Sequence, residues 1–390
     1  MVAPRSIAIV SPRYPDGATV GGAETLLRRF AERLAAHGLD VAFLATCARD
    51  HFTWANECPA DVRRVNGVEV RRFPVSPDRD PALFHARQAA ISRGETLTRA
   101  EQEEWLRHSV NSDALLDFLR AEGKRFDRLL AGPYLFGLVR AVARAFPDRT
   151  LLVPCLHDEP FARQSVIGEM LRAVRGCLFN TEPERDLAGR LHGPEACRGA
   201  VVGLGLDPFE ADPRAFAARR GLGAPYVFYC GRREAGKGTP LLTDYLRAFR
   251  ARTGRDVALV CAGSGPLDSA PFIHDVGFLP EKEKHEALAG AVAFVHPSAL
   301  ESLGIVLLES FLAGTPALVR AGGEVLRWQC ARSGGGLWFR HYPDFETELE
   351  LMLDRPDLRR AMGERARTFV RREYAWSAVE SRLLQALETL

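Results

Sequence analysis

Short apolar runs alternate with longer stretches of helical periodicity along most of this chain. The first pair is the clearest. The run Ser6–Val10 predicts a β-strand, and after a loop the stretch Ala23–His37 repeats apolar residues with the period of an amphipathic helix. Gly38 follows that helix as a C-terminal glycine commonly does, and Val41–Ala45 predicts the next strand. Such alternation is typical of parallel sheets covered by helices.

Residues 74–112 interrupt this rhythm, because they are at first polar and aperiodic. The stretch Arg99–Leu119 then predicts one long helix. Before this region, the Asn66-Gly67 turn leads into a predicted strand, Val68–Phe73. After it, further strands are predicted at Arg128–Ala131, Leu151–Cys155 and Gly176–Phe179.

A segment of mixed Gly, Pro and Asp, Gly203–Pro225, predicts a linker, and beyond it the alternation begins again. The predicted strands there are Tyr226–Tyr229, Val257–Cys261, Ala293–Val295 and Pro316–Val319, and the helices are Thr239–Ala251, Glu281–Gly290, Ile305–Ala313 and roughly Ser377–Leu390. We therefore expect an α/β protein with two Rossmann-like, doubly wound parallel-sheet domains, residues 1–205 and 206–373, facing across a cleft. Ligands of such sheets bind at the carboxyl ends of the strands.

The composition argues against several classes of function. Lys and Arg (52) nearly balance Asp and Glu (50), so nucleic-acid binding has no basic surface to rest on. The eight cysteines are scattered without a Cys-x-x-Cys pair, and we expect buried free thiols in a reducing compartment. No apolar stretch approaches the roughly 20 residues of a membrane span. We expect a cytoplasmic protein, at most in peripheral contact with the inner face of a membrane.

Glycine-rich and charged loops follow several predicted strands. Gly21 and Gly22 precede the first helix, where a bare backbone can approach a ligand beside the N–H donors of the helix N-terminus; a flexible surface loop is the alternative. In the second half, the loop Gly231-Arg-Arg-Glu-Ala-Gly-Lys-Gly238 sets Arg232 and Lys237 among glycines. A guanidinium and an ammonium there suit a diphosphate, and a solvated charged turn is the alternative. The spacing differs from that of the Gly-x-x-x-x-Gly-Lys-Ser/Thr phosphate loop.

Two further turns have a similar position. Gly263-Ser264-Gly265 follows a predicted strand and lets a ligand lie on the backbone. Gly277-Phe278-Leu279-Pro280 is an apolar turn whose backbone groups suit a flat base. Ordinary tight turns are the alternative for both.

The segment from Pro297 to Glu309 carries two carboxylates. Glu301 lies in the loop after a predicted strand, and Glu309 lies in the helix that begins near Gly304. Residues eight apart on a helix differ by about 80° around the axis and about 12 Å along it, so the two carboxylates should hold separate parts of one extended ligand. Carboxylates accept hydrogen bonds from the neighbouring hydroxyls of sugars, and the helix start favours phosphate. A buried Glu309 paired with a distant Arg is the alternative.

Two histidines lie close to predicted strand ends. His157 follows Leu151–Cys155 and is a candidate site residue, although a lone histidine is more often structural. His296, beside the Glu301 loop, is interpreted as a strand cap and left out of the site.

In this order, the loops resemble those of the retaining glycosyltransferases of family 4, glycosyl transferases group 1, which have the GT-B fold. The resemblance covers nearly the whole chain. It rests on Gly21-Gly22, His157-Asp158, Gly231-Arg232 with Lys237-Gly238, Gly263-Ser-Gly-Pro266, Gly277-Phe-Leu-Pro280, Glu301-x7-Glu309, Gly322-Gly323 and Tyr374-Ala-Trp376.

The resemblance implies transfer of a sugar from a nucleoside diphosphate to an acceptor hydroxyl with retained anomeric configuration, without a divalent metal or another cofactor. Arg232 and Lys237 would neutralise the diphosphate, and Glu309 would bond the ribose hydroxyls. Glu301 and His157 would hold the donor sugar. The remaining donor-binding residues would be Gly21, Gly22, Gly263, Ser264, Gly265, Phe278, Leu279, Ser302, Leu303, Gly304 and Ile305. The terminal helix, residues 374–390, would return to the first domain.

The chain departs from the family pattern at Ser302-Leu303-Gly304, where Gly-Phe-Gly is more usual. The acceptor stays open among a glycan, a lipid-linked sugar, a protein and a small metabolite. Two other functions fit this fold class: a nucleotide-sugar epimerase, and a non-catalytic nucleotide-sugar-binding protein. A nicotinamide dehydrogenase fits poorly, because no Gly-x-Gly-x-x-Gly joins the first strand to the first helix.

Overall fold

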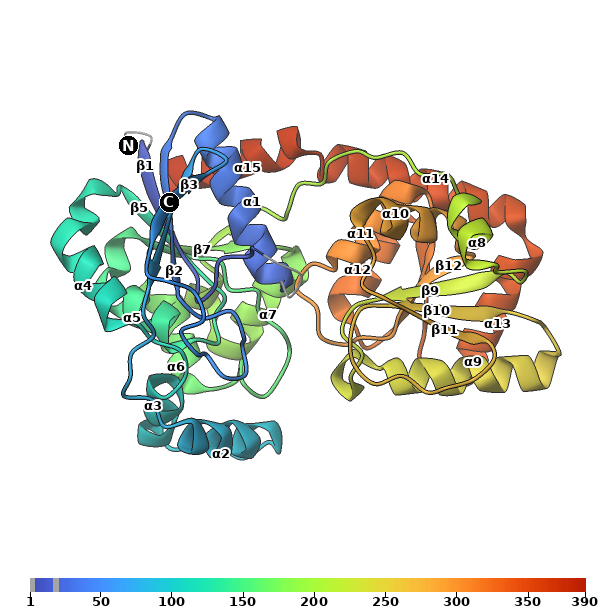
Figure 1. The fold of residues 1–390 in the computed structure, drawn as a ribbon, viewed down its shortest axis with the longest axis horizontal. Helices are drawn as coiled ribbons and strands as arrows, with labels where there is room; N and C mark the ends of the chain where they lie inside the picture. The colour runs from blue at the N-terminus through green and yellow to red at the C-terminus, as the bar shows by residue number, and fades with distance from the viewer. Residues whose placement is uncertain (1–3, 17–20) are drawn as a thin grey trace. The chain divides into compact units, whose positions relative to one another are not determined.

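The computed structural model of the chain describes residues 4–16 and 21–390. The chain forms two compact units, Met1–Leu204 with Glu380–Leu390, and Gly205–Val379 (Figure 1). The last helix changes unit at Glu380, so residues 374–379, which we assigned to the first domain, belong to the second unit.

The first unit is built on an eight-stranded sheet with the order β3-β4-β2-β1-β5-β6-β7-β8. All neighbouring strands are parallel except β3 and β4. Its strands are β1 (Ser6–Val10), β2 (Asp40–Thr46), β3 (Val62–Val65), β4 (Val68–Phe73), β5 (Arg128–Ala131), β6 (Thr150–Leu152), β7 (Gly176–Phe179) and β8 (Gly199–Val201). Its helices are α1 (Gly22–Ala36), α2 (Pro81–Ser92), α3 (Arg99–Arg107), α4 (Asp113–Glu122), α5 (Gly137–Ala145), α6 (Ser165–Ala173), α7 (Glu182–His192) and most of α15 (Trp376–Thr389).

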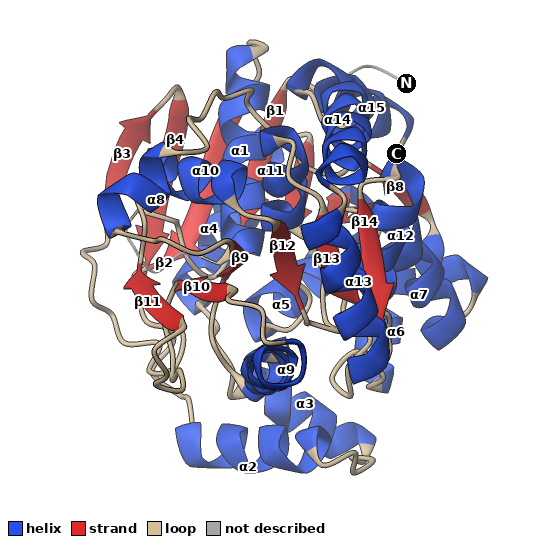
Figure 2. Ribbon diagram, turned by 90° about the vertical axis from the view of Figure 1, so that its right-hand side faces the viewer, coloured by secondary structure: helices blue, strands red, loops and turns tan. Residues whose placement is uncertain are grey.

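The second unit is built on a six-stranded parallel sheet with the order β11-β10-β9-β12-β13-β14, and Figure 2 shows β12, β13 and β14 side by side. Its strands are β9 (Tyr226–Cys230), β10 (Ala258–Ala262), β11 (Ile273–Gly277), β12 (Ala293–His296), β13 (Ala317–Arg320) and β14 (Gly336–Phe339). Its helices are α8 (Ala215–Arg220), α9 (Thr239–Thr253), α10 (Glu281–Gly290), α11 (Ile305–Ala313), α12 (Glu324–Ser333), α13 (Tyr342–Asp354) and α14 (Pro356–Glu373).

The central strands are buried because helices cover both faces of each sheet. In β1, Ile7–Val10 have no exposed surface, and in β9, Val227–Tyr229 have none either. Strands buried on both faces read as continuous apolar runs, which is why the sequence pattern revealed them. The pattern did not reveal β3, whose residues alternate between exposed and partly buried positions at the edge of the sheet.

The prediction of one long helix over Arg99–Leu119 is wrong, because polar side chains divide it into α3 and α4. Asn111 donates from Nδ2 to the carbonyl oxygens of Leu106 (3.1 Å) and Arg107 (2.9 Å), which ends α3. Ser112 then starts α4 by accepting a hydrogen bond at Oγ from the Leu115 amide.

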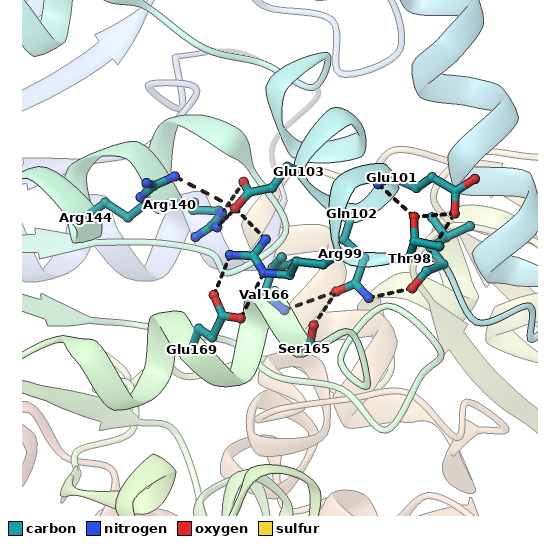
Figure 3. Close-up of polar contacts among 11 residues, drawn as sticks. Thr98, Arg99, Glu101, Gln102, Glu103, Arg140, Arg144, Ser165, Val166 and Glu169 are labelled. Carbon is teal, nitrogen blue, oxygen red and sulfur yellow. Dashed lines mark hydrogen bonds and ion pairs between the residues drawn. The ribbon is translucent and has the colours of Figure 1, made fainter.

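The segment 74–112, which includes α2 and α3, is attached to α6 by polar contacts (Figure 3). Gln102 accepts hydrogen bonds at Oε1 from Ser165 Oγ (3.0 Å) and from the Val166 amide (3.1 Å), at the start of α6. Arg99 forms an ion pair with Glu169 one turn further on, at 2.6 Å. The region without a clear period is therefore helical and is held against α6 within the first unit.

Two further expectations concern cysteines and membranes. All eight cysteines are free, as predicted, and six of them are buried. Over residues 4–16 and 21–390, none of the helices is both long enough and apolar enough to span a bilayer.

Candidate functional site

The second sheet has its topological switch point between β9 and β12. From β9 the chain passes to β10 and β11 on one side, then returns to β12, β13 and β14 on the other side. The loops that leave the carboxyl ends of β9 and β12 therefore diverge, and a crevice at such a point is the usual ligand site of an open α/β sheet.

The loops from these two strands meet in an ion pair between Lys237 and Glu301. Lys237 Nζ lies 2.7 Å from Glu301 Oε1 and also donates to the Leu300 carbonyl oxygen at 3.1 Å. His296, the last residue of β12, places Nε2 at 3.2 Å from the same Glu301 oxygen. The Lys237 and Glu301 side chains are only 19% and 18% exposed, so this cluster is largely shielded from water.

Glu301 is held in its charged form by these neighbours. Burial acts to raise its pKa, but the hydrogen bond from His296 and the positive charge of Lys237 outweigh burial and lower the pKa below the usual value of a glutamate. Near neutral pH, Glu301 therefore offers a carboxylate that accepts hydrogen bonds and does not donate a proton.

Glu309 lies on α11 and has a different cation partner. Lys284, on α10, donates from Nζ to Glu309 Oε1 at 2.9 Å and to Glu281 Oε1 at 3.1 Å. Burial acts to lower the pKa of Lys284, yet the two carboxylates outweigh it and raise the pKa. Glu301 and Glu309 thus belong to separate ion pairs, and that they hold separate parts of one ligand stays a prediction.

The surroundings of Glu309 include the ligand types that a metal would need. The donor atoms of Glu281, His285 and Glu309 lie within 4.8 Å of one another. Among these groups, however, the ammonium of Lys284 already supplies a positive charge to both carboxylates. Burial and the same lysine lower the pKa of His285, whose ring stacks on Phe209 at 3.5 Å.

The loop after β9 is joined to the loops after β10 and β11, at the carboxyl edge of this sheet, by backbone hydrogen bonds. The Gly231 amide donates to the Ala262 carbonyl at 3.1 Å, and the Gly263 amide donates to the Gly277 carbonyl at 2.8 Å. Gly265 has a φ of +113°, and a Cβ there would lie 2.2 Å from the Arg233 carbonyl oxygen, so only glycine permits this approach. The structure therefore brings together the loops that the sequence placed after separate strands.

The individual side chains of these loops differ in exposure. Arg232 is 58% exposed and lies 3.6 Å from Glu234, so its guanidinium is accessible to a ligand. Phe278 is 61% exposed at the tip of its turn, whereas Leu279 is half-buried. Ser264 contributes its carbonyl oxygen, which accepts the Arg233 amide at 2.7 Å.

The segment between the two glutamates forms the start of α11. Ser302 and Leu303 are buried, and Gly304 adopts a left-handed conformation with a φ of +78° immediately before Ile305, the first residue of the helix. A Cβ on Gly304 would lie 2.5 Å from a Leu326 methyl carbon. The left-handed backbone therefore favours glycine at this position, and the two residues before it, which depart from the family pattern, are buried.

In the first unit, Gly21 and Gly22 begin α1. Neither glycine has a positive φ, and Gly21 is the N-cap residue in an extended conformation. The neighbouring Glu24 accepts a hydrogen bond from Arg13 Nε at 3.0 Å. The loop before Gly21 includes residues 17–20, which lie outside the described residues, so its approach to a ligand stays a prediction.

His157 lies in the loop after β6, five residues beyond the end of the strand rather than two. Its Nδ1 lies 3.7 Å from Glu159 Oε1, which accepts a hydrogen bond from the Tyr134 hydroxyl at 2.6 Å. Burial, together with the charge of Glu159, raises the pKa of Tyr134 well above its usual value. His157 therefore belongs to a polar group at the carboxyl edge of the first sheet, and its role towards a sugar stays a prediction.

Sequence reasoning missed three residues of the second unit. His296 was interpreted as a strand cap, but it contacts Glu301. Lys284 lies in no recognisable motif. In the Gly231–Gly238 loop the sequence pattern pointed to Arg232 and not to the adjacent Arg233. Their positions in the sequence were the only signal. Polar residues at the end of a buried strand or beside a charged loop tend to lie at the carboxyl edge of the sheet, where ligands bind.

A groove of about 480 Å³ on the first unit lies between α3 and α5. It is lined by residues of both charges, and Glu103 pairs there with Arg140 and lies 3.8 Å from Arg144 (Figure 3). Because Arg140, the buried charge among these, is already paired with Glu103, the groove does not identify a ligand.

Comparison with known proteins identifies the class of this arrangement. Among solved structures, sucrose-phosphate synthase from Thermosynechococcus elongatus matches with a TM-score of 0.74 at 19% identity, over 98% of each chain. The Anabaena protein HepE in complex with UDP and glucose matches with a TM-score of 0.69 at 14% identity, over 99% of this chain and 100% of that one. These similarities, together with the two parallel-sheet units, confirm the expected GT-B fold.

The sequence comparison supports one family. Residues 215–369 match the profile of the family described as Glycosyl transferases group 1. The D-inositol 3-phosphate glycosyltransferase of Saccharomonospora viridis is 26% identical to this chain, over 98% of this chain and 93% of that protein. These matches support an assignment to the glycosyl transferases of group 1, in agreement with the resemblance drawn from the loops.

Proposed function

We propose that this glycosyltransferase takes a sugar from a nucleoside-diphosphate sugar and transfers it to an acceptor hydroxyl with retention of the anomeric configuration, without a metal ion. The observation that carries the proposal is the cluster of Lys237, Glu301 and His296 at the switch point between β9 and β12. It combines a cation for a departing phosphate with a carboxylate for sugar hydroxyls, at the edge where ligands bind.

Each charged residue binds a different part of the donor. Arg232, which is exposed, and Lys237 neutralise the diphosphate, and this charge stabilisation replaces a metal in promoting departure of the leaving group. Glu301 accepts hydrogen bonds from the donor sugar, and Glu309 accepts them from the ribose. The turn with Phe278 and Leu279 and the Gly263–Gly265 turn hold the base.

The acceptor hydroxyl attacks on the face from which the diphosphate departs, and the departing phosphate oxygen takes up the proton of the hydroxyl. Glu301 remains ionised throughout, in keeping with its lowered pKa, and holds the sugar without forming a bond to the anomeric carbon.

The first experiment is a thermal-shift screen of the full chain with UDP, GDP, ADP and their glucose or mannose derivatives. We expect one nucleoside diphosphate to stabilise the protein by about 2.7 kcal/mol at 100 times its dissociation constant, because a ligand that binds only the folded state stabilises it by mass action. UDP is the first choice because the structural neighbour HepE is in complex with it. A screen without any stabilising nucleotide contradicts the proposal.

The second experiment follows the sugar. D-Inositol 3-phosphate, named in a relative's activity, is the first acceptor to try, and the anomeric proton coupling of the product reports retention or inversion. Incubation with the donor alone distinguishes the epimerase alternative, because an epimerase forms an isomeric nucleotide sugar without an acceptor. Full activity after EDTA treatment is expected, and loss of activity that Mg²⁺ restores contradicts metal independence.

A further inference from the structure

Two neighbouring arginines of the loop Gly231–Gly238, which is proposed to bind the diphosphate, differ in exposure. Arg232 is 58% exposed, whereas Arg233 is only 5% exposed. We propose that the ion pair between Arg233 and Asp275 is the positioning element that holds three loops of the donor site in the shape that binds a nucleoside diphosphate. This inference rests on the proposed function and adds to it two residues that touch the loops rather than the ligand.

Arg233 uses its whole guanidinium on protein partners. Nη1 and Nη2 donate to the two carboxylate oxygens of Asp275 at 2.9 and 2.8 Å, and Nε donates to the Gly265 carbonyl oxygen at 2.9 Å. The Arg233 amide adds a bond of 2.7 Å to the Ser264 carbonyl. The loop after β9 is thereby tied to the turn after β10 at two points and to β11 at a third.

Asp275 extends the connection to the third loop. Its Oδ1 also accepts a hydrogen bond from the Gly277 amide at 3.0 Å, which fixes the start of the turn that carries the exposed Phe278. The Gly277 carbonyl in turn accepts the Gly263 amide at 2.8 Å. A closed set of directional bonds therefore links the loops proposed to hold the diphosphate and the base.

The choice of residues indicates a geometric role. Removing an arginine from water is costly, and a well-packed apolar residue at a buried position is often as stable or more stable. What an apolar residue does not supply is a planar fork that fixes the angle and distance between two loops. Lysine supplies the charge but not the two parallel bonds, so Arg233→Lys separates charge from geometry.

The test compares Arg233→Leu, Arg233→Lys and Asp275→Asn with a matched control, Arg255→Leu. Arg255 makes a bidentate pair with Asp354 in the same unit, at 2.7 Å for each bond, but it precedes β10 at the amino edge of the sheet. Each variant is characterised by its melting temperature, by its dissociation constant for UDP (or for GDP or ADP, whichever binds the wild type) and by donor kinetics. All binding is measured at least 10 °C below the melting temperature, so that each protein is folded.

A positioning role predicts that the dissociation constant rises roughly tenfold in Arg233→Leu, Arg233→Lys and Asp275→Asn, since a misplacement of about 1 Å can cost up to about 100-fold. The KM for the donor should rise with it, and kcat should fall much less than in Lys237→Ala, because Arg232 and Lys237 keep their charges while only the shape of their loop changes. Amide hydrogen exchange at Gly263 and Gly277 should accelerate in these variants. Arg255→Leu should alter none of these quantities.

Two results overturn the inference. One is a lower melting temperature with unchanged nucleotide affinity and unchanged KM, which is what a merely structural pair gives. The other is an equal loss of affinity in Arg255→Leu, which indicates a general loss of stability. A wild-type chain that binds no nucleoside diphosphate at all refutes the proposed function instead, so the two failures are distinguishable. If Arg233→Leu does not fold, Arg233→Lys and Asp275→Asn still decide the question.

Discussion

Replacing Glu301 with glutamine removes one negative charge from the Lys237 cluster and changes almost nothing in size. In the wild type, Glu301 Oε1 lies 2.7 Å from Lys237 Nζ and 3.2 Å from His296 Nε2, and the carboxylate is 18% exposed. In Glu301→Gln, the ammonium of Lys237 stays largely buried and keeps the Leu300 carbonyl oxygen as a partner, but the neutral amide replaces its charged partner. Because one member of a largely buried pair is lost, the change should destabilise the unit.

The expected size follows from these contacts. A hydrogen bond to a charged group contributes about 1.5–3 kcal/mol, and the amide of glutamine retains part of it, so we expect a loss of about 2 kcal/mol in the free energy of unfolding. For a unit of this size, 1 kcal/mol lowers the melting temperature by about 2–4 °C, so the unit Gly205–Val379 should melt about 4–8 °C lower.

The loss should depend on pH, with a sign set by the lowered pKa of Glu301. A carboxyl group whose pKa is lower in the folded state than in the unfolded state stabilises fully above its unfolded pKa, and the stabilisation is lost as the pH falls through the folded pKa. The difference between wild type and Glu301→Gln should therefore be constant from pH 6 to pH 8 and should shrink below about pH 4.3, the ordinary pKa of a glutamate.

The assay is thermal unfolding at several pH values without ligand, followed by circular dichroism. Asp244→Asn is the control, because Asp244 pairs with Arg247 at 2.8 Å on the surface, where it is 67% exposed, and such pairs contribute about 0–1 kcal/mol. If Glu301→Gln lowers the melting temperature no more than Asp244→Asn does at pH 7, the reasoning about the buried pair is refuted.

Three other substitutions test the site. Lys237→Ala should reduce turnover about 100- to 1,000-fold at saturating donor through lost stabilisation of the leaving group, and unchanged turnover in a coupled nucleotide-release assay would remove Lys237 from this role. Lys284→Met should lower the free energy of unfolding by about 2 kcal/mol, because Glu309, only 8% exposed, loses a bond of 2.9 Å to a cation; urea titration measures this, and a loss below 0.5 kcal/mol would contradict it. Gly265→Ala should unfold at a lower urea concentration than Gly236→Ala, because an added Cβ meets the Arg233 carbonyl at 2.2 Å in the first and nothing within 4 Å in the second; equal midpoints would show that the turn adapts.

The elements that the sequence predicted well are those with a strong local signal. The buried strands β1, β9 and β12 are continuous apolar runs, and helices such as α1 and α9 are amphipathic over several turns. The edge strand β3 and the break between α3 and α4 were missed, because exposed strands lack an apolar run and a break made by capping side chains leaves the hydrophobic period intact.

The candidate site divides in the same way. Glycines beside charged residues after predicted strands indicated the loops of Lys237, Gly265 and Glu301. Such a prediction is possible because a tight turn often requires glycine at one position. The partners of those residues come from distant parts of the chain. Asp275 is 42 positions from Arg233, and Lys284 is 25 positions from Glu309.

The sequence by itself therefore determined the fold class and the order of the loops and indicated a family, since each depends on short-range patterns that every conformation of the chain retains. Only the tertiary structure decided which charges meet. The order of the second sheet sets β9 beside β12, and this places Lys237 and Glu301 in contact although 64 positions separate them. Whether a buried charge has a partner depends on the distance between side chains that are far apart in the sequence. Hydrophobic periodicity reports only on neighbouring positions and does not give that distance.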